Sequence, residues 1–147
     1  GFGAPATPNV DRWTLLVNDL CRQAVSSSHL RLNSDGSQLR DFITLGDFTR
    51  AILHIISLDS DYLDNGLFNL GSGKSVSILK MAERVAARWR ANSGREIDIM
   101  RPDGHALSPA PLNFCCEKLI NTGFTLTSKV DDEIDATLEL CNRVFAR

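Results

Sequence analysis

The chain has 147 residues, of which 43% are hydrophobic and 23% charged, and it carries a formal net charge of -2 with an isoelectric point near 5.9. This length suits a single domain with a buried core, and the slightly acidic balance argues against nucleic-acid binding, which usually needs a basic face. No apolar run approaches the ~20 residues of a membrane span and no signal-peptide pattern opens the chain, so we expect a soluble protein without a membrane partner.

The cysteines and histidines are scattered along the chain. The four cysteines form no C-x-x-C pair and are Cys21, Cys115, Cys116 and Cys141. The adjacent pair lacks the spacing of ordinary zinc ligands, and the three histidines add nothing to a metal site: His29, His54 and His105. The sequence therefore favours free thiols in a reducing cytoplasm over a redox or metal role.

The first predicted element is a helix that begins after Pro8-Asn9, with Asn9 as its cap. Apolar residues then recur at spacings of three and four, which is typical of one buried helix face: Val10, Trp13, Leu16, Val17, Leu20, Cys21 and Ala24. The polar run at residues 26–28 ends this helix.

Asp35-Gly36 is a tight-turn dipeptide between two short apolar runs at residues 30–32 and 42–45, which predicts a hairpin. Gly46-Asp47 then opens a second helix that runs to residue 58, with Asp47 as the N-cap. This helix is apolar over most of its circumference, so we expect it to be covered on more than one side.

Arg40 stands where turn, strand and second helix meet. Its guanidinium group could bind a phosphate or carboxylate there. It could equally pair with Asp41 or Asp47 and only brace the corner.

Residues 67–70 read as a short strand after the Asn65-Gly66 turn. Residues 71–75 invite a phosphate-loop interpretation, but Phe68 stands where the Walker A pattern needs its first glycine, and Val76 stands at the third glycine position of the dinucleotide fingerprint. A strand-to-helix turn is therefore favoured, followed by a helix that Ser77 caps and that ends near Gly94.

The last third of the chain holds a strand at residues 97–100, which leads Arg101 into a proline-rich loop that continues to residue 111. A short helix at residues 115–122 follows, stopped by Gly123. Ser128 with Asp131 is similar to a capping box, and it introduces a final helix whose buried stripe is Ile134, Leu138, Cys141 and Phe145.

Three groups of residues resemble the C-terminal half of the extended short-chain dehydrogenases/reductases, the NAD-dependent nucleotide-sugar epimerases and dehydratases. They are the DGSQ-x-RDF-x-x-x-x-D run of residues 35–47, the FNLGSG and VSI runs of residues 68–78, and Arg101-Pro102. Their order and spacing fit over nearly the whole chain. The resemblance implies one mixed α/β substrate-binding domain at residues 1–147, with about five helices and a few short strands, and with the N-terminal Rossmann core missing.

The resemblance also implies a binding site. In this family two arginines clamp the substrate's diphosphate, and the matching segments place them at Arg40 and Arg101. The family's Arg-Pro segment is commonly followed by Gly-Asp, whose order is reversed here. The implied substrate contacts are Arg40, Arg101, Phe42, Leu32 and Asp103. Phe2 lies in what is similar to the tail of the loop beside the nicotinamide ring, so it is the expected cofactor contact.

The family's catalytic tyrosine and lysine, four residues apart, have no counterpart, because the single tyrosine is Tyr62 and the fourth residue after it is Gly66. We therefore expect this chain alone to bind no NAD and to catalyse nothing, with NAD implied for the full-length family. The first function predicted is binding of the diphosphate of a nucleotide sugar. The alternatives are a non-catalytic interaction module, whose uncovered apolar surface would bind the missing Rossmann half or a second copy, and a phosphate-binding protein that uses residues 71–75.

Overall fold

The computed structural model describes residues 1–7, 9–103 and 112–146. The predicted mixed α/β class is confirmed, with six helices in the described part instead of about five; the extra helix, α3, lies between the second predicted helix and the Asn65-Gly66 turn. The elements in chain order are α1 (Leu16–Ser26), β1 (His29–Arg31), β2 (Leu39–Asp41), α2 (Leu45–Ile56), α3 (Ser60–Leu63), β3 (Ser75–Ser77), α4 (Ile78–Ser93), β4 (Asp98–Met100), α5 (Glu117–Asn121) and α6 (Val130–Phe145).

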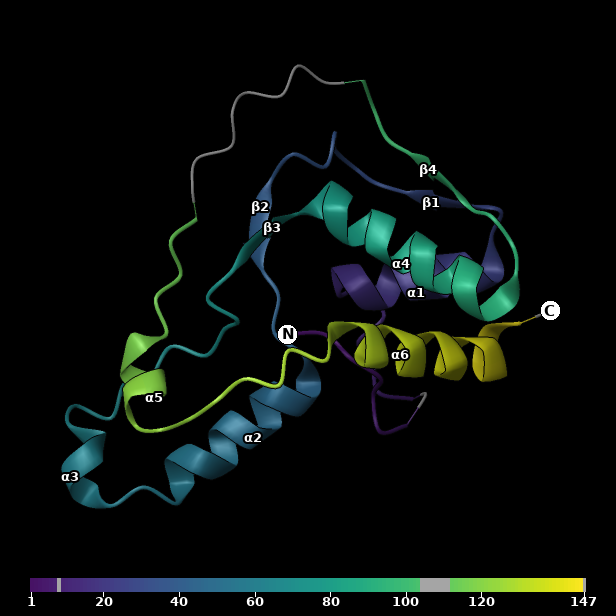
Figure 1. Ribbon diagram of the computed structural model, residues 1–147. Helices are drawn as coiled ribbons and strands as arrows, with labels where there is room; N and C mark the ends of the chain where they lie inside the picture. Colours follow the sequence, from purple (N-terminus) through teal and green to yellow (C-terminus); the bar gives the residue numbers. More distant parts are fainter. Residues whose placement is uncertain (8, 104–111, 147) are drawn as a thin grey trace.

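Helices α1, α4 and α6 pack together and form what we call the helical lobe, on the right of Figure 1. Each helix buries one apolar stripe, as the spacing of its residues predicts. The ion pair of Arg84 with Asp131 (2.6 Å) and that of Arg88 with Asp135 join α4 to α6 at the surface. The fully buried core of the lobe includes Val17, Leu20, Cys21, Leu30, Met81, Val85, Ile134 and Cys141.

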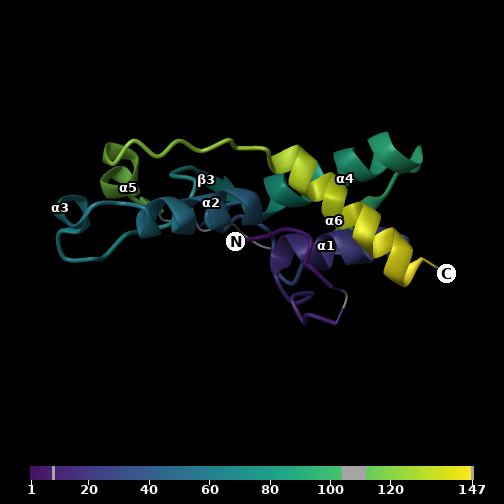
Figure 2. The same ribbon diagram turned by 90° about the horizontal axis from the view of Figure 1, so that it is seen from below.

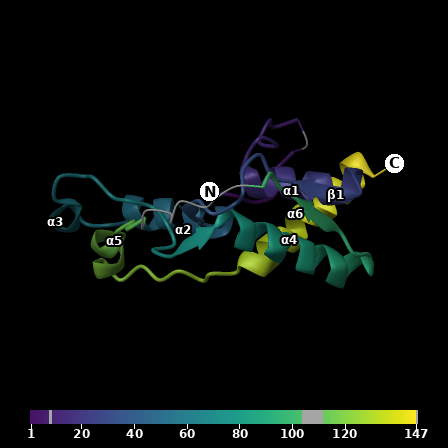
Figure 3. The same ribbon diagram turned by 90° about the horizontal axis from the view of Figure 1, so that it is seen from above.

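Helices α2, α3 and α5 form a second unit, the α2 lobe, which extends away from the helical lobe in all three views (Figures 1, 2 and 3). Its own small core holds Ala51, Leu119 and Phe124. The ammonium group of Lys118 donates to the Leu63 carbonyl (3.2 Å) and the Asn65 side chain (2.6 Å), which fastens α5 to the end of α3. The two lobes therefore have separate cores.

Two small sheets replace the predicted hairpin. β1 pairs in parallel with β4, and β2 pairs antiparallel with β3, so the two strands on either side of Asp35-Gly36 do not pair with each other. Gly36 does adopt a positive φ of 79°, as a turn glycine should, but its carbonyl accepts from Leu79 at the start of α4. The predicted turn therefore forms, but the strands on either side of it pair with segments far along the chain.

Two further sequence predictions are wrong in detail. The strand expected at residues 67–70 is absent, although the segment is described, and the first helix begins at Leu16 and not after Asn9. Trp13 still reaches the core from the preceding turns, packing edge-on against Phe145 with ring centroids 5.0 Å apart. Trp13 is thus buried without a helix, whereas Val10 is exposed.

The helix caps also differ from the prediction at two places. Thr44, and not Asp47, caps α2 by accepting from the Asp47 amide (3.1 Å), because Asp47 lies inside the first turn. Ser128 has a positive φ of 52° and does not cap α6. By contrast, Ser77 and Gly94 cap the two ends of α4 as predicted. Gly104, His105 and the proline-rich loop to residue 111 lie outside the described residues.

Candidate functional site

Arg40 lies in the middle of β2, where its Cα partner is Val76 of β3. The side chain is exposed, and its Nη1 donates to the Leu39 carbonyl (2.8 Å), which leaves other guanidinium N–H groups available to a ligand. Asp41 and Asp47 hydrogen-bond elsewhere, so within the described residues neither acts as the predicted brace of Arg40. The open side of this arginine can bind an anion.

Arg101 follows β4 directly and is also exposed. Its Nη1 donates to the Asp35 carbonyl (2.9 Å). Hydrogen bonds from the backbone and hydroxyl of Ser37 lower the pKa of the Asp35 carboxyl, and the charge of Arg101 acts in the same direction. Arg101 lines a cavity of about 480 Å³ whose other walls are His29, Arg31, Leu32, Asn33, Met100 and Pro102.

Arg101 is thus bonded to the connection between β1 and β2 through the Asp35 carbonyl, and Arg40 lies in β2, the strand into which that connection leads. Arg40 does not line the cavity that Arg101 lines. In the part of the chain that the structure describes, only Arg101 of the two is bonded to the connecting segment, and the two guanidinium groups do not share a cavity.

The remaining expected contacts divide into two groups. Leu32 is buried and lines the cavity beside Arg101, while Asp103 is exposed two residues further along the chain. Phe42 is half-buried and packs edge-on against the buried Phe2, with ring centroids 6.5 Å apart. Phe2 and Phe42 thus support each other in the core, and Leu32 is the predicted contact that adjoins an arginine.

Residues 71–74 form the predicted turn, which leads through β3 into α4. The amides of Ser72 and Lys74 donate to the two oxygens of the Asp41 carboxylate, at 2.6 and 3.1 Å. A carboxylate of the chain thus stands where a phosphate loop would hold its ligand. We call this arrangement the Asp41 clasp. The sequence pattern did not reveal it, because its partners are more than thirty residues apart.

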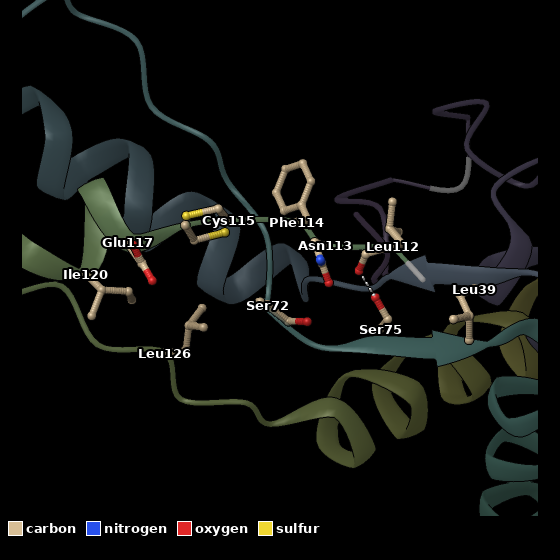
Figure 4. Close-up of a pocket in the computed structure, with 12 residues that line it drawn as sticks. Leu39, Ser72, Ser75, Leu112, Asn113, Phe114, Cys115, Glu117, Ile120 and Leu126 are labelled. Atoms are coloured by element: carbon tan, nitrogen blue, oxygen red, sulfur yellow. Dashed lines mark hydrogen bonds between the residues drawn. The ribbon is translucent and has the colours of Figure 1, made fainter. Parts of the chain in front are cut away.

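A cavity of about 510 Å³ lies between the clasped turn and the segment before α5 (Figure 4). The Ser75 hydroxyl donates to the Leu112 carbonyl at its edge, and Phe114 and Ile120 are among its apolar walls. Cys115 is exposed there and Cys116 is buried; burial first, and then the nearby charge of Asp41, raise the pKa of the Cys116 thiol. No group of three metal-ligating side chains occurs among the described residues.

An apolar surface on α2 is exposed. It consists of Leu45, Ile52, Leu53 and Ile56, of which Leu53 is 62% and Ile56 75% exposed. Beside it lies an apolar cavity of about 490 Å³ that Phe2, Leu15 and Phe48 help to line. We call these four residues the apolar α2 face. No described helix is long and apolar enough to cross a membrane.

Comparison with known proteins gives one sequence relative and many structures. No protein-family model matches the chain. It is 32% identical over 87 residues to dTDP-L-rhamnose 4-epimerase of Burkholderia thailandensis. The matched segment covers 59% of this chain and 23% of that protein. The chain therefore spans about a quarter of this curated relative.

The fold is shared with larger enzymes of known structure. RMD from Pseudomonas aeruginosa complexed with NADPH matches with a TM-score of 0.73 and 19% identity, over 96% of this chain and 45% of that one. UDP-glucuronic acid 4-epimerase from Bacillus cereus, in complex with UDP-glucuronic acid and NAD, matches with a TM-score of 0.70 and 18% identity, over 97% and 43%. The present fold corresponds to less than half of each of these structures.

Proposed function

We propose that this chain binds the diphosphate of a nucleotide sugar. Its sequence and its fold resemble the C-terminal part of the NAD-dependent nucleotide-sugar epimerases, which belong to the extended short-chain dehydrogenase/reductase family. The observation that supports the proposal is the exposure of Arg40 in β2 and of Arg101, which is bonded to the connection that leads into β2, each with donors left for a ligand. Guanidinium groups bind phosphate oxygens bidentately and keep their charge when partly desolvated.

We further propose that residues 1–147 act as one substrate-binding domain beside an NAD-binding Rossmann part. Phe2 and Thr44 form an isolated parallel bridge, in which the Phe2 amide donates to the Ile43 carbonyl (3.1 Å) and the Leu45 amide to the Phe2 carbonyl (2.7 Å). Parallel strands occur almost always in larger sheets covered on both faces. This bridge beside the apolar α2 face fits the border of such a sheet. The free thiols suit a reducing, cytoplasmic setting.

Replacing Arg40 with alanine is the direct test of the diphosphate site. A charge-assisted hydrogen bond contributes about 1.5–3 kcal/mol, so we expect the affinity for UDP or dTDP, measured by titration calorimetry, to fall about tenfold or more. Arg101→Ala should have an effect of the same order. The control is Arg90→Ala, which removes an exposed arginine of α4 that pairs with Glu96. Equal affinity in the wild type and Arg40→Ala would remove Arg40 from the site.

The apolar α2 face supports a second candidate, a non-catalytic interaction module, in which the face binds a separate Rossmann part or a second copy of the chain. In either case the chain alone should self-associate, and Ile56→Glu should shift its sedimentation toward the monomer because it places a charge on the face. Asn142→Glu adds the same charge at an exposed polar position of α6, in the helical lobe, and serves as the control. A wild-type chain that sediments as a stable monomer at all concentrations would contradict this expectation.

A further inference from the structure

The sheet that carries Arg40 is very small. β2 and β3 pair through Leu39 with Ser77, Arg40 with Val76 and Asp41 with Ser75, and the two strands are far apart in the chain. A two-stranded sheet of this size is marginal on its own. Since side chains alternate between the faces of a strand, a slip of one residue would turn Arg40 to the opposite face. The direction of its guanidinium group therefore depends on whatever holds this register.

The Asp41 clasp ties the two strands together at one end of the sheet. Asp41 is the last residue of β2, and the amides that it accepts from, those of Ser72 and Lys74, come just before β3. The neighbouring Gly71 leaves room for this contact, since a Cβ there would lie 2.9 Å from Asp41 Oδ1. Both carboxylate oxygens are used, so a shifted strand would break two hydrogen bonds to a charged group at once.

The two faces of β2 have different surroundings. Leu39 lines the cavity of Figure 4, and Asp41, two residues on, turns to the clasped loop. Arg40 points to the other face, as the pleat requires, and there it is exposed. The clasp thus holds the strand on one side while the arginine stays open on the other.

We propose that Asp41 is the positioning residue of the anion site, because its clasp on the Ser72 and Lys74 amides fixes the register of β2 on β3 and so directs Arg40 outward. This inference rests on the proposed function for its ligand, a nucleoside diphosphate. Asp41 itself does not touch that ligand. Its carboxylate acts through the strand.

Asp41→Asn tests the proposal with little change of shape. An asparagine oxygen can accept from one of the two amides, while its NH₂ group opposes the other, so the clasp is lost in part. We expect the affinity for UDP to fall about five- to tenfold while the affinity for uridine, which lacks the phosphates, changes less than about twofold. In NMR spectra, the amide resonances of Ser72 and Lys74 should shift, and the cross-strand contact between Arg40 and Val76 should weaken.

Asp135→Asn is the matched control, because Asp135 also accepts hydrogen bonds from two residues, Arg88 and Asn92, but joins α4 to α6. It should leave the ratio of UDP to uridine affinity unchanged. An unchanged ratio in Asp41→Asn, or an intact contact between Arg40 and Val76, would overturn the positioning role. A wild type that binds UDP no better than uridine would instead overturn the proposed function, and the NMR contact would still decide whether the clasp sets the register.

Discussion

Asp47→Ala is expected to lower the free energy of unfolding by about 3 kcal/mol, because it removes a buried carboxylate whose hydrogen bonds join α2 to the start of α6. Asp47 accepts from the amide (2.9 Å) and hydroxyl (2.8 Å) of Thr127 and from the Ser128 amide (2.9 Å). Its fourth donor is Arg50, at 2.8 Å. Urea unfolding at neutral pH measures the loss.

The same carboxylate predicts a pH dependence. Burial alone would raise the pKa of Asp47, but the hydrogen bonds from Thr127, Ser128 and Arg50 outweigh burial, so the pKa lies below its ordinary value of 3.8. The folded protein therefore binds this proton less readily than the unfolded chain. The stabilisation is complete above the ordinary pKa and is lost as the pH falls through the lower pKa of the folded state. The difference in stability between wild type and Asp47→Ala should shrink accordingly between about pH 5 and about pH 2.

Asp59→Ala is the control for both measurements. Asp59 is likewise an aspartate at the start of a helix, in its case the N-cap position of α3, but it makes no capping hydrogen bond with its side chain and is exposed. Its removal should change the stability by no more than about 0.5 kcal/mol. Equal losses in the two variants, or a pH dependence that Asp47→Ala keeps in full, would show that the junction between α2 and α6 does not depend on Asp47.

Gly71→Ala should have the second largest effect, a loss of about 2 kcal/mol in the free energy of unfolding. A Cβ at this buried position would lie 2.5 Å from Phe114 Cε1 and 2.9 Å from Asp41 Oδ1, so both neighbours would have to move. The Phe114 ring is partly exposed and can turn away, but the Asp41 carboxylate is held by its clasp. Thermal unfolding measures the loss.

Gly46→Ala is the contrasting variant. Gly46 lies in the first turn of α2, and the nearest contact of an added Cβ is Glu133 Oε2 at 3.5 Å, an ordinary distance. Alanine favours the helix over glycine by about 0.5–1 kcal/mol, so this variant should gain stability. If Gly71→Ala unfolds at the same temperature as the wild type, the turn does not depend on close contact with Phe114 and Asp41.

Local signals predicted the helices well where both ends are marked. α4 has Ser77 as a capping residue, Gly94 in a left-handed conformation at its end and one buried apolar stripe. All three features can be recognised from residues that are close together in the sequence. The hairpin prediction was wrong for the opposite reason. Asp35-Gly36 favours a turn, but which strands pair afterwards depends on Ile99 and Val76, far along the chain.

The candidate site divides in the same way. Arg40 and Arg101 were identified by resemblance, and their roles stay predictions until binding is measured. The Asp41 clasp had no sequence signal, since an Arg-Asp pair suggests an ion pair between neighbours, whereas the two side chains point to opposite faces of the strand. The apolar residues around the circumference of α2 predicted cover on more than one side, whereas one face of the helix is exposed among the described residues. Uncovered apolar surface was expected only for the interaction module.

The separate cores of the two lobes have a consequence for hydrogen exchange. Among the described residues, the core of the α2 lobe holds three buried apolar residues and that of the helical lobe far more, so the amides of α2 and α5 should exchange through a partial opening of lower free energy. Protection should be greatest along α1 and α6. If the protein opens first at this end, a partner that binds α2 should raise the exchange protection of the α2 lobe more than that of the helical lobe.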